Sequence, residues 1–220
     1  MNRQFLSELD QIKSQILTMG GCVEQALDHA IQALIHRQSS GFQSVHEIEK
    51  RINVDHKLVD EACLNFLAKQ GPKAKDLRLI MSVIKINTDL ERMGDQCVNI
   101  AYTGRDYFSR TALGELRDLE LMSILVRKMV KDSLDAFVRE DEKLAREILL
   151  MDDEVDRLKG KVFKDFTSHI QKSPKDAESA LDVILIARNL ERLGDHATNI
   201  AEDVIFVASG KDVRHGGEYQ

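Results

Sequence analysis

A twelve-residue segment occurs twice in this chain, 100 positions apart. Residues 90–101 and 190–201 align without a gap and are identical at 8 of 12 positions. Lys75-Asp76 also matches Lys175-Asp176 at this offset, so the repeat extends well before the segment itself. A fixed internal spacing of this kind is typical of a duplicated structural unit. The 220 residues therefore divide into two units of about 105 residues, a usual size for a small domain.

Hydrophobic residues recur at intervals of three and four through six long stretches, a spacing typical of amphipathic helices. The stretches are residues 3–37, 44–69, 76–109, 113–139, 141–171 and 176–209. Both prolines fall between stretches, in Gly71-Pro72 and Ser173-Pro174, where a helix must stop because proline has no amide hydrogen. Ser39-Ser40-Gly41 is expected to supply a flexible, left-handed break.

These patterns predict an all-α fold with six long helices, arranged as two tandem, pseudo-symmetric three-helix bundles. The first bundle should cover residues 1–110 and the second residues 111–209. Residues 210–220 are polar and rich in glycine, and we expect them to form a disordered tail. A single six-helix bundle is the alternative that the pattern leaves open.

The charge and hydropathy of the chain limit where it works and what it binds. The formal net charge is −6 and basic residues are not gathered together, which argues against nucleic-acid binding. The first 15 residues carry charges where a signal peptide needs an apolar core, and no run of 18 apolar residues could span a bilayer. Cys22, Cys63 and Cys97 are odd in number and widely spaced, as buried thiols in a reducing compartment often are. We therefore expect a soluble, cytoplasmic protein that reaches a membrane only through its partners.

The duplicated segment places polar side chains along one shoulder of the third helix of each unit. At about 100 degrees per residue, the core stripe of the first copy consists of Leu79, Val83, Ile86, Leu90, Cys97 and Ala101. The polar shoulder beside it consists of Glu91, Asp95 and Asn99, and its counterpart in the second copy of Glu191, Asp195, Asn199 and Asp203. Each unit is thus expected to carry an acidic ridge along a groove of its bundle.

Two carboxylates four residues apart on a helix repel each other, so a cation is expected beside them. One candidate is supplied by the protein itself, since Arg92 and Arg192 each precede the Asp of the ridge by three residues. The other candidate is a metal ion, for which Gly94 and Gly194 would leave space, although tight helix packing alone would also explain these glycines. Oxygen ligands favour Fe, Mn or Mg, whereas Zn usually recruits His or Cys, so the metal stays open. Further donors could come from His196, His56, Asp60, Asp153 or Asp156.

Motifs that indicate catalysis are absent from the sequence. A ferritin-like di-metal enzyme needs Glu-x-x-His pairs, and the predicted helices contain none. His46-Glu47 begins like the zinc-protease motif H-E-x-x-H, but Lys50 stands where the second His is required. Phosphate-binding glycine loops and nucleophile elbows are missing as well. We therefore predict that the protein is not an enzyme.

The segments LERMGD (residues 90–95) and LERLGD (residues 190–195), each running into Asn-Ile-Ala, resemble the duplicated signature of the PhoU family. The resemblance covers essentially the whole chain in length, helix layout and repeat. It implies two three-helix bundles, a homodimer, and multinuclear metal clusters bound through E/D-x-x-x-D motifs, here Glu91 with Asp95 and Glu191 with Asp195. Glu202-Asp203 has Tyr102-Thr103 as its counterpart, so the first site is expected to hold metal more weakly or to hold fewer ions.

The resemblance also implies a role as negative regulator of phosphate uptake and of the phosphate-starvation response. Such a regulator is a metal-binding adaptor between the ATPase of a phosphate ABC transporter and a sensor histidine kinase, which it keeps quiet when phosphate is plentiful. Two other functions stay open from the residues alone. One is a metal-dependent phosphohydrolase that uses the ridges in two-metal fashion, and the other is a metal-free helical scaffold.

Overall fold

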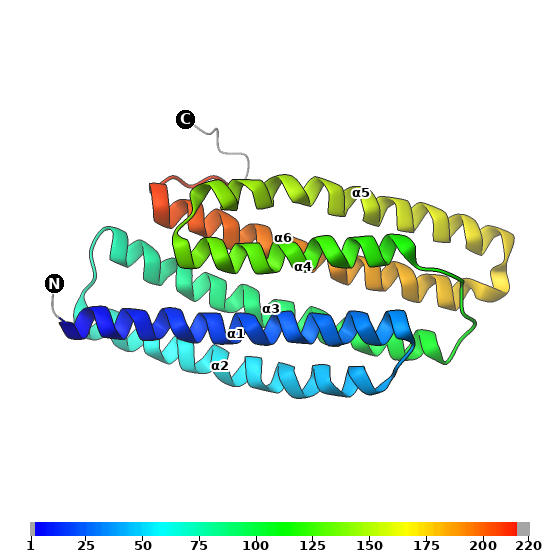
Figure 1. Ribbon diagram of the computed structural model, residues 1–220, viewed down its shortest axis with the longest axis horizontal. Coiled ribbons are helices and arrows are strands. Elements are labelled where there is room, and N and C mark those ends of the chain that lie inside the picture. Colours follow the sequence, from blue (N-terminus) through cyan, green and yellow to red (C-terminus); the bar gives the residue numbers. More distant parts are fainter. Residues whose placement is uncertain (1–2, 215–220) are drawn as a thin grey trace.

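Six long α-helices make up most of the chain (Figure 1). They are α1 (Arg3–His36), α2 (Ser40–Gln70), α3 (Lys75–Phe108), α4 (Arg117–Arg139), α5 (Glu142–Lys172) and α6 (Ala177–Ser209), with a 3-10 turn, η1 (Pro174–Asp176), before α6. This computed structural model describes residues 3–214. The predicted all-α fold with six helices is confirmed. Over the described residues, none of the helices is long and apolar enough to cross a membrane.

The turn between α1 and α2 differs from the prediction. Arg37 is the left-handed residue there (φ 51°), whereas residues 40–41 already belong to α2. Gly41 is needed for another reason, because a Cβ at this position would lie 2.8 Å from Cβ of Ala33 and 3.1 Å from the carbonyl oxygen of His29. The glycine thus allows α1 and α2 to approach closely, and α2 begins at Ser40 rather than at residue 44.

The breaks around the second unit are set by left-handed residues. Gly114 (φ 79°) lies in the segment that joins α3 to α4, so α4 begins at Arg117 rather than at residue 113. Gly210 (φ 77°) ends α6. A disordered tail is predicted from Gly210 on, but Val213 is only 5% exposed and packs against the core. The rest of that predicted tail, residues 215–220, lies outside the described residues.

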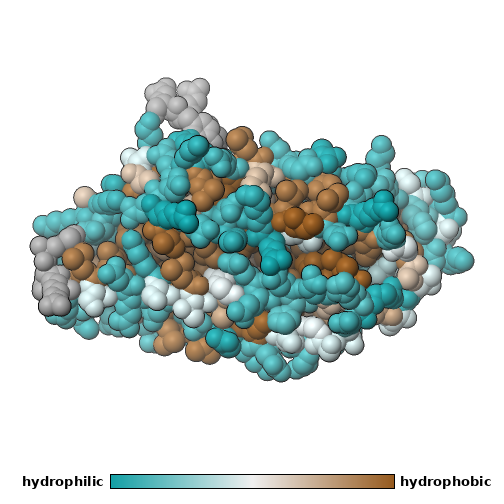
Figure 2. Space-filling view, viewed as in Figure 1, coloured by the Kyte–Doolittle hydropathy of each residue, from teal (hydrophilic) through white to brown (hydrophobic). Residues whose placement is uncertain are grey.

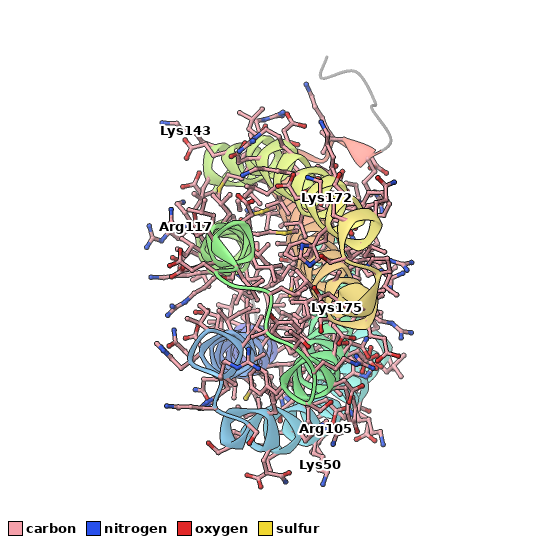
Figure 3. The ribbon with its side chains drawn as sticks, turned by 90° about the vertical axis from the view of Figure 1, so that its right-hand side faces the viewer. Lys50, Arg105, Arg117, Lys143, Lys172 and Lys175 are labelled. Atoms are coloured by element: carbon pink, nitrogen blue, oxygen red, sulfur yellow. The ribbon has the colours of Figure 1, made fainter. Side chains whose placement is uncertain are left out.

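The helices form two three-helix units, α1–α3 and α4–α6, that share one hydrophobic core (Figure 1). α3 packs along α6 and α1 packs against α4. In Figure 3, seen from the end that carries Lys172 and Lys175, the second unit lies above the first. The core stripe predicted for α3 is confirmed, since all of its residues are between 0% and 3% exposed: Leu79, Val83, Ile86, Leu90, Cys97 and Ala101.

Two ion pairs show that α3 and α6 run antiparallel. Arg110, just after the C-terminal end of α3, contacts Asp182 near the start of α6. Lys85, nearer the start of α3, contacts Asp203 near the end of α6 at 3.0 Å. At this register the middle of the duplicated segment in α3 lies level with the middle of its copy in α6.

Hydrophobic residues also occur at the surface, in separate patches among hydrophilic residues on the face where α1 and α4 lie (Figure 2). On α4, for example, Leu121 and Ile124 are exposed by 53% and 58%. Scattered residues of this kind are common on protein surfaces and by themselves indicate no function.

Candidate metal centre

Glu191 and Asp195 lie one turn apart on α6, as the duplicated segment predicts. The carboxylate of Glu191 is largely buried and accepts a hydrogen bond from Nζ of Lys159 on α5 at 2.5 Å. Burial raises the pKa of Asp195, and the negative charges of Glu191 and Asp156 raise it further. The two carboxylates therefore form a crowded acidic site that an additional cation would stabilise.

Asp152 of α5 faces this pair, and sequence reasoning missed it. A Cβ built on Gly194 would lie 3.5 Å from Oδ1 of Asp152, so the aspartate sits directly against the glycine of the duplicated segment. Burial raises the pKa of Asp152 to about 6, with further contributions from the charges of Asp195, Asp156 and Glu191. One signal could have found Asp152, since it occupies the apolar stripe of α5 between the buried Ile148 and Val155.

The first unit lacks this third carboxylate. Gly94 faces Ile52 of α2, whose Cδ1 would lie 3.1 Å from an added Cβ. Ile52 therefore takes the place that Asp152 has in the second unit. Glu91 and Asp95 instead share Arg92, with N–O distances of 3.5 Å to each carboxylate. The protein-supplied cation that the sequence allows is thus present in the first unit.

In the second unit, Asn199 and Asp203 contact α3 rather than the acid pair. Asn99 is exposed. Asn199 donates a hydrogen bond from Nδ2 to Oδ1 of Asp89 on α3 at 3.1 Å. Asp203 is buried, and its carboxylate contacts Lys85 of α3. Beyond Asp195, the polar side of α6 faces the contact between the two units. Asn199 and Asp203 therefore contact α3 and do not extend the ridge.

Of the other proposed donors, Asp156 lies near the ridge, where its charge raises the pKa of Asp195, and Asp153 is exposed. His196 lies with Nδ1 2.8 Å from Oδ1 of Asp89, away from the ridge, as its position after Asp195 predicts. In the first unit, Nδ2 of Asn87 donates to the carbonyl oxygen of His56 and to Oδ1 of Asp60, both at 2.9 Å. These contacts connect α2 to α3 through an amide.

Within residues 3–214, no group of three or more His, Cys, Asp or Glu side chains is spaced to hold a metal ion. The donor chemistry of the second unit still fits a hard cation, because Asp152, Glu191 and Asp195 offer only oxygen atoms and crowd their negative charges together. Lys159 supplies the positive charge in this arrangement. A metal held by all three acids would require Lys159 to release Glu191 and the three side chains to converge.

Comparison with known proteins accounts for the two units. The PhoU domain profile matches the chain twice, over residues 16–103 and 119–204. The chain belongs to the PhoU family. Each PhoU domain contains one acid pair, Glu91 with Asp95 in the first and Glu191 with Asp195 in the second.

Relatives match over nearly the whole length. The phosphate-specific transport system accessory protein PhoU homolog of Pseudomonas putida is 37% identical over 227 residues, which cover 99% of this chain and 85% of that protein. The PhoU accessory protein of Escherichia coli is 36% identical over 214 residues, which cover 97% of this chain and 89% of that protein. These relatives are accessory proteins, so the prediction that this PhoU protein is not an enzyme is confirmed by its family.

Solved structures confirm the PhoU fold. The crystal structure of PhoU from Pseudomonas aeruginosa superposes with a TM-score of 0.92 at 36% identity, covering 94% of this chain and all (100%) of that one. The phosphate transport system regulatory protein PhoU from Streptococcus pneumoniae gives a TM-score of 0.87 at 25% identity, covering 95% and 99%. The same six-helix arrangement therefore occurs in relatives whose sequences differ at most positions.

Proposed function

We propose that this protein is a non-enzymatic, cytoplasmic regulator of phosphate uptake and of the phosphate-starvation response. The observation that supports this most directly is the match of both PhoU domains together with full-length similarity to accessory proteins of phosphate-specific transport. The helical surfaces of the two units act as an adaptor between a phosphate ABC transporter and a sensor histidine kinase, and the protein reaches the membrane only through them.

A cell assay tests the regulatory role. Deleting the gene should switch on a phosphate-starvation reporter in phosphate-rich medium, and restoring the full chain should silence it again. A reporter that stays silent after deletion would contradict the proposal.

Co-purification of a tagged full-length chain with the transporter ATPase and with the kinase tests the adaptor role. Light scattering of the pure protein tests the proposed homodimer.

We further propose that the acid pairs bind divalent or trivalent metal ions, such as Fe, Mn, Mg or Zn. The second unit offers the better site, because Asp152 adds a third carboxylate beside Glu191 and Asp195. A bound cation would neutralise these acids and hold α5 against α6. The first unit, with Ile52 in the equivalent place and Arg92 against both acids, is expected to bind metal more weakly.

Elemental analysis of protein purified without chelator tests the metal proposal. The double variant Glu191→Ala/Asp195→Ala should lose most of the bound metal, and Glu91→Ala/Asp95→Ala should lose less. Equal metal content in the wild type and both variants would place any bound metal elsewhere and remove the proposal, and absence of metal from all three would leave a metal-free scaffold. The regulatory role is tested separately by the cell assay.

A further inference from the structure

A groove runs between α5 and α6 on the second unit, with a volume of about 770 Å³. Its apolar lining comes from both helices and includes Gly160, Phe163, Ile184, Leu185 and Ala187. Nothing lies within 4 Å of the position that a Cβ on Gly160 would occupy, so the groove is open at this point. The groove therefore offers a concave apolar surface without an occupant from the described part of the chain.

Large hydrophobic side chains line the groove and are exposed. Phe163 of α5 is 58% exposed, and Leu185 of α6 is 44% exposed. Leu181, one turn before Leu185, is 51% exposed and extends the apolar stripe along α6. Contiguous exposed apolar surface with a polar border is typical of a protein interaction site.

The border of the groove carries two arginines. Arg188 and Arg192 continue the stripe of α6 and are exposed. Within residues 3–214 neither arginine has an ion-pair partner. Of the two acids that line the groove, Glu191 contacts Lys159, and Asp195 lies three residues after Arg192 on α6. Three basic and two acidic side chains thus line the groove, so its lining is slightly basic in a chain whose formal net charge is −6.

The first unit provides an internal comparison, because the equivalent residues lie 100 positions earlier. Arg92, the counterpart of Arg192, contacts Glu91 and Asp95. Cys63, the counterpart of Phe163, is fully buried. Thr88 replaces Arg188. At these equivalent positions, the combination of an exposed phenylalanine with two unpaired arginines is therefore present in the second unit and absent from the first, among the described residues.

We propose that this groove binds an amphipathic helix of a partner protein, with leucine-like side chains against Phe163 and Leu185 and carboxylates against Arg188 and Arg192. A helix seated by apolar anchors at i, i+3, i+4 and i+7 fits a groove between two antiparallel helices. The inference rests on the proposed adaptor function and assigns that function a surface.

Two other occupants fit the observations less well. A second copy related by two-fold symmetry would bury this basic border on both subunits, since such an interface uses the same patch of each copy. An anionic membrane surface would meet Glu191 and Asp195 inside a concave site, where these acids oppose lipid phosphates. A carboxylate-bearing helix can instead place its acids at the arginines alone.

The test uses the full chain and two synthetic peptides of about 18 residues, a length that spans the anchors of such a helix. One peptide carries leucines at the anchor spacing with glutamates beside them, and the other has lysine in place of each glutamate. Fluorescence anisotropy should show saturable binding of the glutamate peptide to the wild type. Arg188→Glu/Arg192→Glu should bind this peptide about tenfold more weakly and gain binding of the lysine peptide. Arg92→Glu, at the equivalent site of the first unit, should leave the binding of both peptides unchanged.

Several results would overturn the assignment of the groove. The first is an absence of saturable binding by the glutamate peptide. The second is equal binding of this peptide to the wild type and to the charge-reversed variant. The third is binding of the protein to phosphatidylglycerol vesicles that Phe163→Ser abolishes. A wild-type dimer that Phe163→Ser converts to monomer in light scattering would show that a second copy occupies the groove. A strain in which Arg188→Glu/Arg192→Glu still regulates phosphate uptake would reject the groove and leave the proposed function intact.

Discussion

Asp89 of α3 and His196 of α6 meet across the contact between the two units, with Oδ1 of the carboxylate 2.8 Å from Nδ1 of the imidazole. Asn199 donates a hydrogen bond to the same oxygen, so this largely buried carboxylate contacts two side chains of the other unit. The register of the two PhoU domains thus depends partly on a residue that has no charged counterpart, since position 189 is Asn.

Removing this carboxylate should weaken the whole protein. We expect Asp89→Ala to lower the free energy of unfolding by about 1–2 kcal/mol, because His196 and Asn199 both lose their acceptor. Urea unfolding followed by circular dichroism measures the change. The matched control is Asn189→Ala, whose side chain donates to the carbonyl oxygen of Leu185 in its own helix. Equal losses in the two variants would contradict the role of Asp89.

Gly20 and Gly21 are neighbours on α1 with opposite surroundings. A Cβ on Gly20 would lie 2.6 Å from Cδ1 of Leu134 on α4, whereas nothing lies within 4 Å of a Cβ on Gly21. Alanine favours a helix over glycine by about 1 kcal/mol. Gly21→Ala should therefore raise the melting temperature, and Gly20→Ala should lower it because Leu134 must move away. Thermal unfolding of both variants checks the signs, and stabilisation by Gly20→Ala would show that α1 and α4 pack less tightly.

Glu140, between α4 and α5, should make stability depend on pH. Its hydrogen bond to Lys75, at 2.5 Å, and the charge of Lys13 lower the pKa of Glu140 below its ordinary value. A lowered pKa stabilises the folded state at pH values above the ordinary pKa of glutamate, which is about 4. This stabilisation is lost as the pH falls through the pKa of the folded state. Glu140→Gln should thus lower the free energy of unfolding by about 0.5–1 kcal/mol at pH 7 and by progressively less at acid pH. The exposed Glu147→Gln is the control, and a cost independent of pH would contradict the charge argument.

The three cysteines should be unreactive in the folded protein. All are buried, and burial raises the pKa of Cys63 and of Cys97 to about 12. Because the thiolate is the reactive form, alkylation by iodoacetamide at pH 8 should require unfolding. Mass spectrometry of labelled protein with and without urea measures this, and rapid labelling of Cys97 in native protein would mean that the core opens readily.

Metal content should depend on Asp152 but not on the residue beside it. Asp152→Asn removes one carboxylate from the acidic site, while Asp153 is exposed and makes a matched control as Asp153→Asn. Elemental analysis should show less metal in the first variant and unchanged metal in the second. Identical content in both would place any bound metal elsewhere.

Features that depend on a single helix could be predicted from the sequence. The hydrophobic period and its breaks indicated six helices, and the helical wheel of α3 identified its buried stripe. A wheel contains no information on which neighbour covers each shoulder. It therefore grouped Asn199 and Asp203 with Glu191, although α3 lies against α6 there and supplies Asp89 and Lys85.

Neighbouring helices also explain why identical motifs behave differently. In the first unit Arg92 contacts the acid pair of its own helix, but in the second unit Glu191 forms an ion pair with Lys159 of α5. The residue at the equivalent position in α2 is Val59, which is buried and cannot bind a carboxylate. Asp152 could not be predicted for the same reason, because it joins the acidic site only by lying against Gly194 of another helix.

Antiparallel packing of α3 on α6 is the arrangement that two separate three-helix chains would adopt around a two-fold axis. Joining both halves in one polypeptide replaces a concentration-dependent association by a permanent one. Identical subunits must also mutate together, whereas fused halves can diverge. Asp152 opposite Ile52, and Phe163 opposite Cys63, are such divergences, and they allow one half to specialise while the other preserves the scaffold.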